Sequence, residues 1–121
     1  MIDINYLQAL AVDALEDVKA TDIVVFDTTR LTSLFERIII ASGNSNRQTK
    51  ALAASVRDKI REAGGSVVSV EGEDTGEWVL VDLGGIIVHI MQPAIRNYYR
   101  LEEIWGGEEI DLETAKSALK Q

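Results

Sequence analysis

The sequence has no cysteine, one proline and one histidine in 121 residues. Without cysteine, disulfides, thiolate nucleophiles and cysteine-based zinc sites are all excluded, and nothing marks an oxidising compartment. A single histidine also excludes a metal site built from several imidazoles. We therefore predict a cytoplasmic protein whose fold depends on its apolar core alone, which a chain of this length can supply.

Long apolar runs are missing as well. No stretch approaches the roughly 20 apolar residues that a membrane-spanning helix needs. The first ten residues, MIDINYLQAL, carry an acid where an export signal carries basic residues. We predict a protein that is neither exported nor bound to a membrane.

Basic residues are fewer than acidic ones, with 12 Lys and Arg against 20 Asp and Glu, which gives a net charge of −8. Such a field repels a phosphate backbone, so we expect little direct binding to nucleic acid and a better fit to a basic protein. One acidic segment has no Lys or Arg within it. It is either a solvated loop or a surface that steers a basic partner, and it contains Glu71, Glu73, Asp74, Glu77 and Asp82.

Apolar periodicity predicts an amphipathic helix over residues 3–19 and strands over 22–26 and within 34–43. Ser45 and Gln48 have the S-x-x-Q spacing of a capping box, which predicts that a helix begins there. Gly64 and Gly65 should end that helix.

Three β-branched runs follow at 66–70, 77–83 and 86–91, and the last two should form a hairpin. Pro93 suits the first position of a helix that we expect to continue to Trp105. We divide the chain into a domain over residues 1–106 and an acidic C-terminal extension over 107–121 with a short helix. The predicted fold class is α+β, a mixed sheet with helices packed on it.

Residues 41–48, ASGNSNRQ, lie between a predicted strand and a helix start, where free backbone amides attract anions. The sequence matches neither the P-loop nor the dinucleotide-binding pattern. A nucleotidyltransferase would need several convergent carboxylates for its metal ions, and Asp82 has no visible partner. We predict no catalytic residue, cofactor or metal ligand, and keep a divergent nucleotidyltransferase as the alternative.

The segment RNYYRLEEIWGG, residues 96–107, concentrates three of the few aromatic side chains. Tyr98 and Trp105 follow one helical stripe, whereas Tyr99 lies about 100° around the axis, so both tyrosines cannot point into the core. A large ring left in water forgoes about 1.5–3 kcal/mol of burial, and such rings are commonly buried by a partner. Periodicity alone leaves core and interface both open.

Residues 77–107 resemble the signature W-h-h-h-D-x-G-x-h-h-h-H-h-h-x-x-x-x-R-x-Y-Y-x-L-E-x-h-W, where h is apolar, of the ribosomal silencing factor family, the Iojap-related proteins. Residues 38–53, IIIASGNSNRQTKALA, are similar to the second shared block of that family. The resemblance covers about residues 4–107. It departs from the family at residues 35–37, commonly Asp-Tyr-Phe, and at Met91, often Phe.

The resemblance implies a non-enzymatic translation repressor that binds the large ribosomal subunit through ribosomal protein L-fourteen and blocks subunit joining under nutrient limitation. It further implies a nucleotidyltransferase-like fold without catalytic acids, and homodimers away from the ribosome. A third hypothesis is a generic dimeric adaptor whose aromatic surface binds another partner. Carried over by position, the expected partner-binding residues are Trp78, Asp82, His89, Met91, Tyr98 and Tyr99, with Arg96 and Glu102 orienting neighbours and Leu101 and Trp105 in the core.

Overall fold

The computed structural model describes residues 2–120 and contains one mixed sheet of six strands in the order β3-β4-β5-β2-β1-β6. β2 and β5 run parallel, and the other neighbours run antiparallel. The strands are β1 (Thr21–Asp27), β2 (Arg37–Ser42), β3 (Ser69–Glu71), β4 (Trp78–Asp82), β5 (Ile86–Met91) and β6 (Glu108–Ile110).

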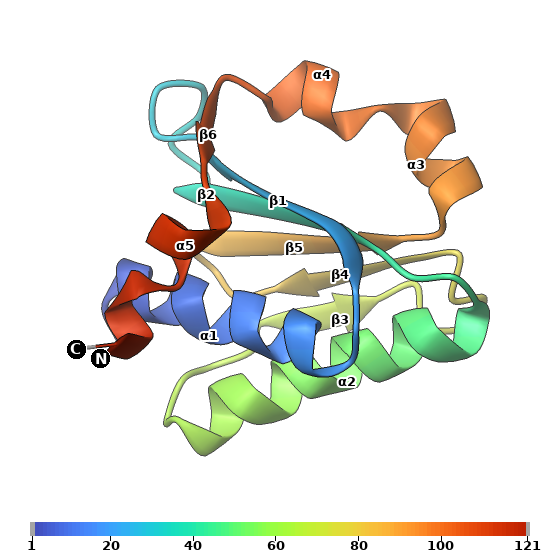
Figure 1. Cartoon of the computed structure of the whole chain (residues 1–121), viewed down its shortest axis with the longest axis horizontal. Coiled ribbons are helices and arrows are strands. Elements are labelled where there is room, and N and C mark those ends of the chain that lie inside the picture. The colour runs from blue at the N-terminus through green and yellow to red at the C-terminus, as the bar shows by residue number, and fades with distance from the viewer. Residues whose placement is uncertain (1, 121) are drawn as a thin grey trace.

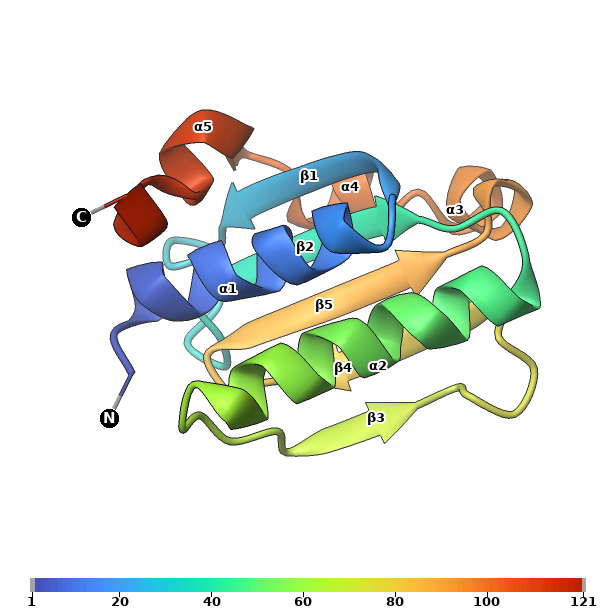
Figure 2. The ribbon, with the colours of Figure 1, turned by 60° about the horizontal axis from the view of Figure 1, so that its bottom comes forward.

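Helices lie on both faces of the sheet (Figure 1). α1 (Ile4–Asp17) and α2 (Asn46–Glu62) cover one face side by side, as Figure 2 shows. Their apolar stripes meet the inward residues of β2, β4 and β5 in the main core, where Leu15, Val56 and Ile60 are fully buried. α3 (Pro93–Tyr99) and α4 (Leu101–Trp105) lie over the opposite face.

The prediction of an α+β fold with helices on a mixed sheet is confirmed. The relation to nucleotidyltransferases stays a prediction.

The start of α2 makes only one of the two hydrogen bonds of a capping box. Ser45 Oγ accepts from the Gln48 amide at 3.0 Å, but Gln48 Oε1 accepts from the Asn44 amide, one residue before the cap.

The predicted hairpin is β4–β5, in which Trp78 lies opposite Met91 and Leu80 opposite His89. Its turn needs a left-handed residue, which Gly84 provides with φ of 86°. Asp82 Oδ1 accepts from the Gly84 amide at 2.8 Å and so fixes the turn.

The prediction of one continuous helix over 93–105 is wrong. Arg100 adopts φ of 50° and divides the segment into α3 and α4. The break changes the direction of the chain, so Leu101 packs on the sheet while Tyr98 stays in solvent. No sequence signal marks the break, because no glycine or proline lies at it and arginine rarely adopts a left-handed conformation.

The C-terminal segment contains a strand, β6, that the sequence analysis did not predict. β6 pairs with β1, and after it α5 (Leu112–Ala115) and a 3₁₀ helix (Ser117–Lys120) pack beside α1. Ala115 is fully buried in the main core, and its carbonyl accepts from Gln8 Nε2. The division of the chain at residue 106 stays a prediction.

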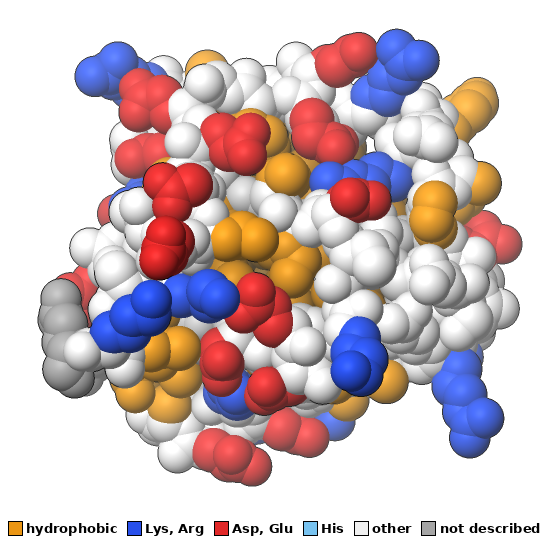
Figure 3. Space-filling model, viewed as in Figure 1, with side chains coloured by type: hydrophobic (Ala, Val, Ile, Leu, Met, Phe, Trp, Pro, Cys, Tyr) orange, Lys and Arg blue, Asp and Glu red, His pale blue; other side chains and the backbone are white. Residues whose placement is uncertain are grey.

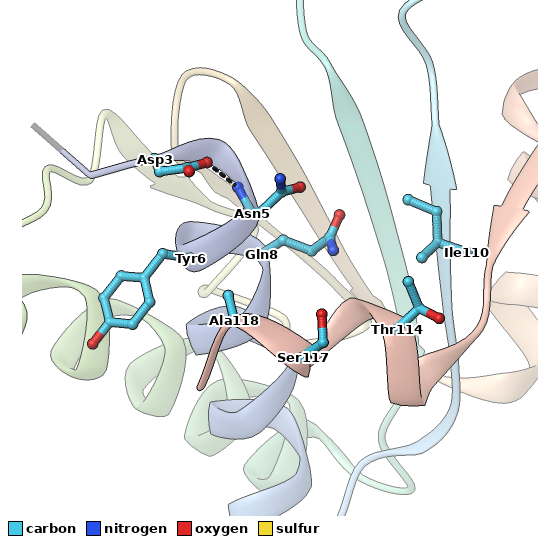
Figure 4. Close-up of a pocket in the computed structure, with 8 residues that line it drawn as sticks. All are labelled: Asp3, Asn5, Tyr6, Gln8, Ile110, Thr114, Ser117 and Ala118. Atoms are coloured by element: carbon cyan, nitrogen blue, oxygen red, sulfur yellow. Dashed lines mark hydrogen bonds between the residues drawn. The ribbon is translucent and has the colours of Figure 1, made fainter. Parts of the chain in front are cut away.

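A polar cavity of about 300 Å³ remains where this segment meets the start of α1 (Figure 4). Gln8, on its wall, is held by Arg37 Nε and by the Ala115 carbonyl. Asp3 caps the Asn5 amide at its rim. These polar groups already have partners within the protein, and we assign the cavity no binding role.

Candidate functional site

The second face of the sheet is only partly covered. Under α3 and α4 lies a small apolar cluster, with Ile38, Ile40 and Met91 fully buried. Toward β4 the cover ends, and the outward side chains of β4 and β5 meet the rings of α3. We call Trp78, His89, Tyr98 and Tyr99 the aromatic patch.

Trp78 on β4 and His89 on β5 are diagonal neighbours across the strand pair. Trp78 Nε1 donates to His89 Nδ1 at 2.9 Å, so the imidazole proton is on Nε2. Burial lowers the pKa of His89 from 6.5 to about 4, which keeps the ring neutral at physiological pH. The imidazole acts here as a fixed acceptor that orients the indole.

The tyrosines continue this row of rings outward. The Tyr99 ring packs on Trp78 with centroids 5.0 Å apart, and Tyr98 meets Tyr99 edge-on, also at 5.0 Å. Tyr98 is 80% exposed and Tyr99 50% exposed. Both rings therefore lie at the surface and are held against each other before any partner arrives, and their role as partner-binding residues stays a prediction.

Arg96 holds α3 in place from its other side. It is buried, and its Nη1 donates to the Asp22 carbonyl at 2.7 Å and to Ser42 Oγ at 2.8 Å. Its Nε donates to Glu102 Oε2 at 3.0 Å. The pair thus ties α3 to α4, β1 and β2, and its role in orienting the partner-binding residues stays a prediction.

Three further residues belong to the small apolar cluster beside the patch. The expectation that Met91 contacts a partner is wrong, because Met91 is fully buried beside Trp78 and presents no surface of its own. Leu101 is buried as expected, and Trp105 packs edge-on against Phe35 with centroids 5.1 Å apart. Trp105 keeps partial exposure, and Phe35 occupies one of the positions where the sequence departs from the family pattern.

Asp82 lies at the far end of β4 from Trp78 and caps the hairpin turn, so the structure does not bring it into the aromatic patch. Between them lies Leu80, half-buried and opposite His89, which the sequence analysis missed. Strand alternation from Trp78 through Leu80 to Asp82 was the signal that could have found it.

The acidic segment borders the patch. Glu71 lies opposite Leu80 in the β3–β4 pair, and Glu77 directly precedes Trp78. Within residues 2–120, none of the five acids of this segment forms an ion pair. Their charge is therefore directed at solvent or at a partner.

The loop before α2 already uses its hydrogen-bonding groups on itself. The Gln48 and Asn44 amides are bonded to the Ser45 and Gln48 side chains, so they do not form an open cradle for phosphate. No group of three His, Asp or Glu side chains in the described part of the chain is placed to hold a metal ion. Over the same residues, no helix is both long enough and apolar enough to cross a membrane.

Comparison with known proteins adds an independent finding. The family model described as ribosomal silencing factor during starvation matches residues 2–121. The ribosomal silencing factor of Chromobacterium violaceum is 54% identical over 107 residues, covering 88% of each chain, and that of Zymomonas mobilis is 38% identical over 118 residues, covering 97% of this chain and 89% of its own. A crystal structure of a Chromobacterium violaceum protein superposes with a TM-score of 0.86 at 53% identity, covering 91% of this chain and 92% of that one.

Proposed function

This chain belongs to the ribosomal silencing factor family, and we propose that it represses translation by binding the large ribosomal subunit through ribosomal protein L-fourteen. Bound there, it occupies space that the small subunit needs, chiefly when nutrients are limiting. The action is steric and non-enzymatic, and it takes place in the cytoplasm. The observation that carries the proposal is the aromatic patch, whose exposed tyrosines pack on each other, with Tyr99 also packed on Trp78.

The patch has the physical properties of a protein-binding hot spot. Tyrosine and tryptophan dominate such sites because they bury much area while ordering few torsions. Here the rings are already packed together, and the Trp78–His89 hydrogen bond fixes the innermost one. Little side-chain entropy remains to be lost when a partner covers Tyr98, which favours affinity.

The unpaired acids beside the patch supply the preference for a basic partner. Charges at an interface rim mainly steer association and reject like-charged proteins. The binding rate should therefore fall as salt rises, because exposed charges are screened over about 10 Å at 0.1 M salt. Removing the charges of Glu73 and Asp74 together should reduce that salt dependence.

The direct test is co-sedimentation of the protein with isolated large subunits at low salt. We expect the wild-type protein to pellet with large subunits at micromolar concentration, and a Tyr98→Ser, Tyr99→Ser variant to remain in the supernatant while keeping its circular dichroism spectrum. A wild-type protein that never pellets would refute ribosome binding. Retained binding in the variant would place the contact elsewhere.

The joining block needs its own measurement. Light scattering should show that mixing the two subunits forms fewer complete ribosomes when the large subunits are loaded with the protein first. If loaded large subunits join at the normal rate and extent, the protein binds without silencing. Analytical ultracentrifugation of the purified protein without ribosomal subunits tests our further proposal that the free protein forms a homodimer.

A further inference from the structure

One edge of the sheet is left open halfway along β1. β6 pairs with Val25, Phe26 and Asp27, and at Asp111 the chain turns away into α5. Within residues 2–120, no strand pairs with the outer side of β1 over Thr21 to Val24. Thr21 and Asp22 are exposed there and Val24 is half-buried.

This open edge forms the side of a groove of about 540 Å³ between β1 and α3. Ile23, Val24 and Pro93 give it apolar surface, while Arg96 and Asn97 line it from α3. Arg96 binds the Asp22 carbonyl and Ser42, so the groove is fixed in shape by a buried hydrogen-bonded network.

The surroundings of the groove are acidic. Asp22, Arg96 and Glu102 line it. Arg96 and Glu102 are paired with each other, and Asp22 forms no ion pair within residues 2–120, so the lining keeps an excess of negative charge. Acidic side chains gather over the neighbouring α4 and β6 in Figure 3. On these two elements, Glu103 and Glu108 are paired with Arg100 and Arg30, and Glu109 is exposed and has no ion pair within residues 2–120.

We propose that this groove binds an extended, basic segment of a partner protein, which adds to β1 as a strand in line with β6. An unpaired strand edge offers backbone donors and acceptors to such a segment, and pockets for alternate side chains give specificity. The open stretch is four residues long and contains a β-bulge, since the pairing of β1 with β2 shifts between Thr21 and Val24 and Asp22 has φ of 50°. Apolar side chains of the segment face Ile23 and Pro93, and its Lys or Arg side chains reach the acidic rim.

The charge argues for this occupant over others. A nucleic acid would bring phosphates to an acidic rim, and a second copy of a chain with net charge −8 would bring more acids. The aromatic patch presents its rings from the same helix, α3, whose Arg96 and Asn97 line the groove. The groove is nonetheless a separate site, since its lining includes none of the patch residues.

The test uses three labelled hexapeptides and the full chain, with binding followed by fluorescence anisotropy. An alternating Lys-Val peptide should bind, while a Glu-Val peptide should not. The same Lys-Val peptide, N-methylated at alternate residues on one edge, should also fail, because it cannot complete the strand. If the N-methylated peptide binds as tightly as the unmodified Lys-Val peptide, backbone hydrogen bonds do not contribute to binding, and strand addition is overturned.

Location is decided by amide hydrogen exchange and by matched variants. The bound peptide should slow exchange at Thr21 to Val24, and protection at the other sheet edge, β3, would contradict the assignment. Asp22→Asn removes one rim charge but still tolerates its φ of 50°, and should weaken binding roughly threefold. Asp74→Asn, away from the groove, is the control, and the Tyr98→Ser, Tyr99→Ser variant should bind the peptide normally even if ribosome binding is lost.

Discussion

One face of the sheet lies under α1 and α2, helices of 14 and 17 residues, whereas the other lies under α3 and α4, of seven and five residues. Long helices bury a continuous apolar stripe and can be held by packing alone. Helices as short as α3 and α4 have almost no stability of their own. Their position has to be fixed by specific contacts, and those contacts are the ones that orient the aromatic patch.

The comparison separates residues that stabilise the fold from residues that present a surface. Leu52 and Ile60, on the α2 side, have no exposed area. On the α3 side the polar groups of His89 and Arg96 are buried, and each makes hydrogen bonds that set the position of a ring or a helix. The first face therefore carries the stability of the protein, and the second carries its proposed binding surface.

The largest expected effect is a loss of stability on the α2 side. Ile60→Ala leaves a cavity in the main core and should lower the free energy of unfolding by about 2–5 kcal/mol. Leu34→Ala removes a side chain that is 81% exposed and should change it by less than about 0.5 kcal/mol. Urea unfolding of both variants checks the prediction, and comparable losses would mean that Leu34 is not free in solution.

A smaller loss is expected when Arg96 is removed. Arg96→Ala leaves Glu102, Ser42 and the Asp22 carbonyl without their donor and should cost about 2 kcal/mol. Because α3 then loses its attachment to β1 and β2, ribosome binding should fall as well. Arg96→Lys is the control that keeps the charge without the guanidinium fork. Full recovery in that variant would show that charge alone positions α3.

His89 predicts a pH dependence of stability. Its folded pKa is about 4 against 6.5 for the free side chain, so below pH 6.5 the unfolded chain takes up a proton that the folded protein excludes. The free energy of unfolding should fall by roughly 2 kcal/mol between pH 6.5 and pH 4.5 from this group. His89→Gln should remove that part of the slope. Parallel pH profiles for the two proteins would contradict the burial of the imidazole.

The smallest effect concerns the break between α3 and α4. Arg100 has φ of 50°, which glycine adopts without strain. Arg100→Gly should therefore leave the stability unchanged or raise it by up to about 1 kcal/mol, whereas Arg100→Val should lower it. Thermal unfolding of both variants measures the difference. A glycine variant less stable than the valine variant would show that this segment is one helix in solution.

The two faces also differ in how far the sequence could predict them. The apolar spacing of α1 and α2 and the alternation of β4 and β5 are local patterns, and they predicted the covered face. Part of the patch was open to the same reasoning, since Tyr98 and Tyr99 cannot share one helical face. Their identification as partner-binding residues came from the resemblance to a family signature. The family match confirms that the chain belongs to that family, and the roles of the two residues stay a prediction.

The rest depends on contacts between distant parts of the chain. The Trp78–His89 hydrogen bond requires the register of β4 on β5, and the Arg96 network requires Ser42 and Asp22 to come together from two other strands. β6 has the sequence Glu-Glu-Ile, which carries no strand pattern and pairs only because β1 lies beside it. Periodicity contains none of this information.

The most direct test of the account is one matched pair of substitutions, one on each side of the molecule. Tyr98→Ala and Tyr6→Ala each remove an exposed tyrosine ring, the first from the aromatic patch and the second from α1. We measure the Kd of each folded variant for isolated large ribosomal subunits. The account predicts that Tyr98→Ala weakens binding by about 30-fold or more while Tyr6→Ala matches the wild type. Equal affinities for the two variants, or a larger loss with Tyr6→Ala, would show that the aromatic patch is not the ribosome-binding surface.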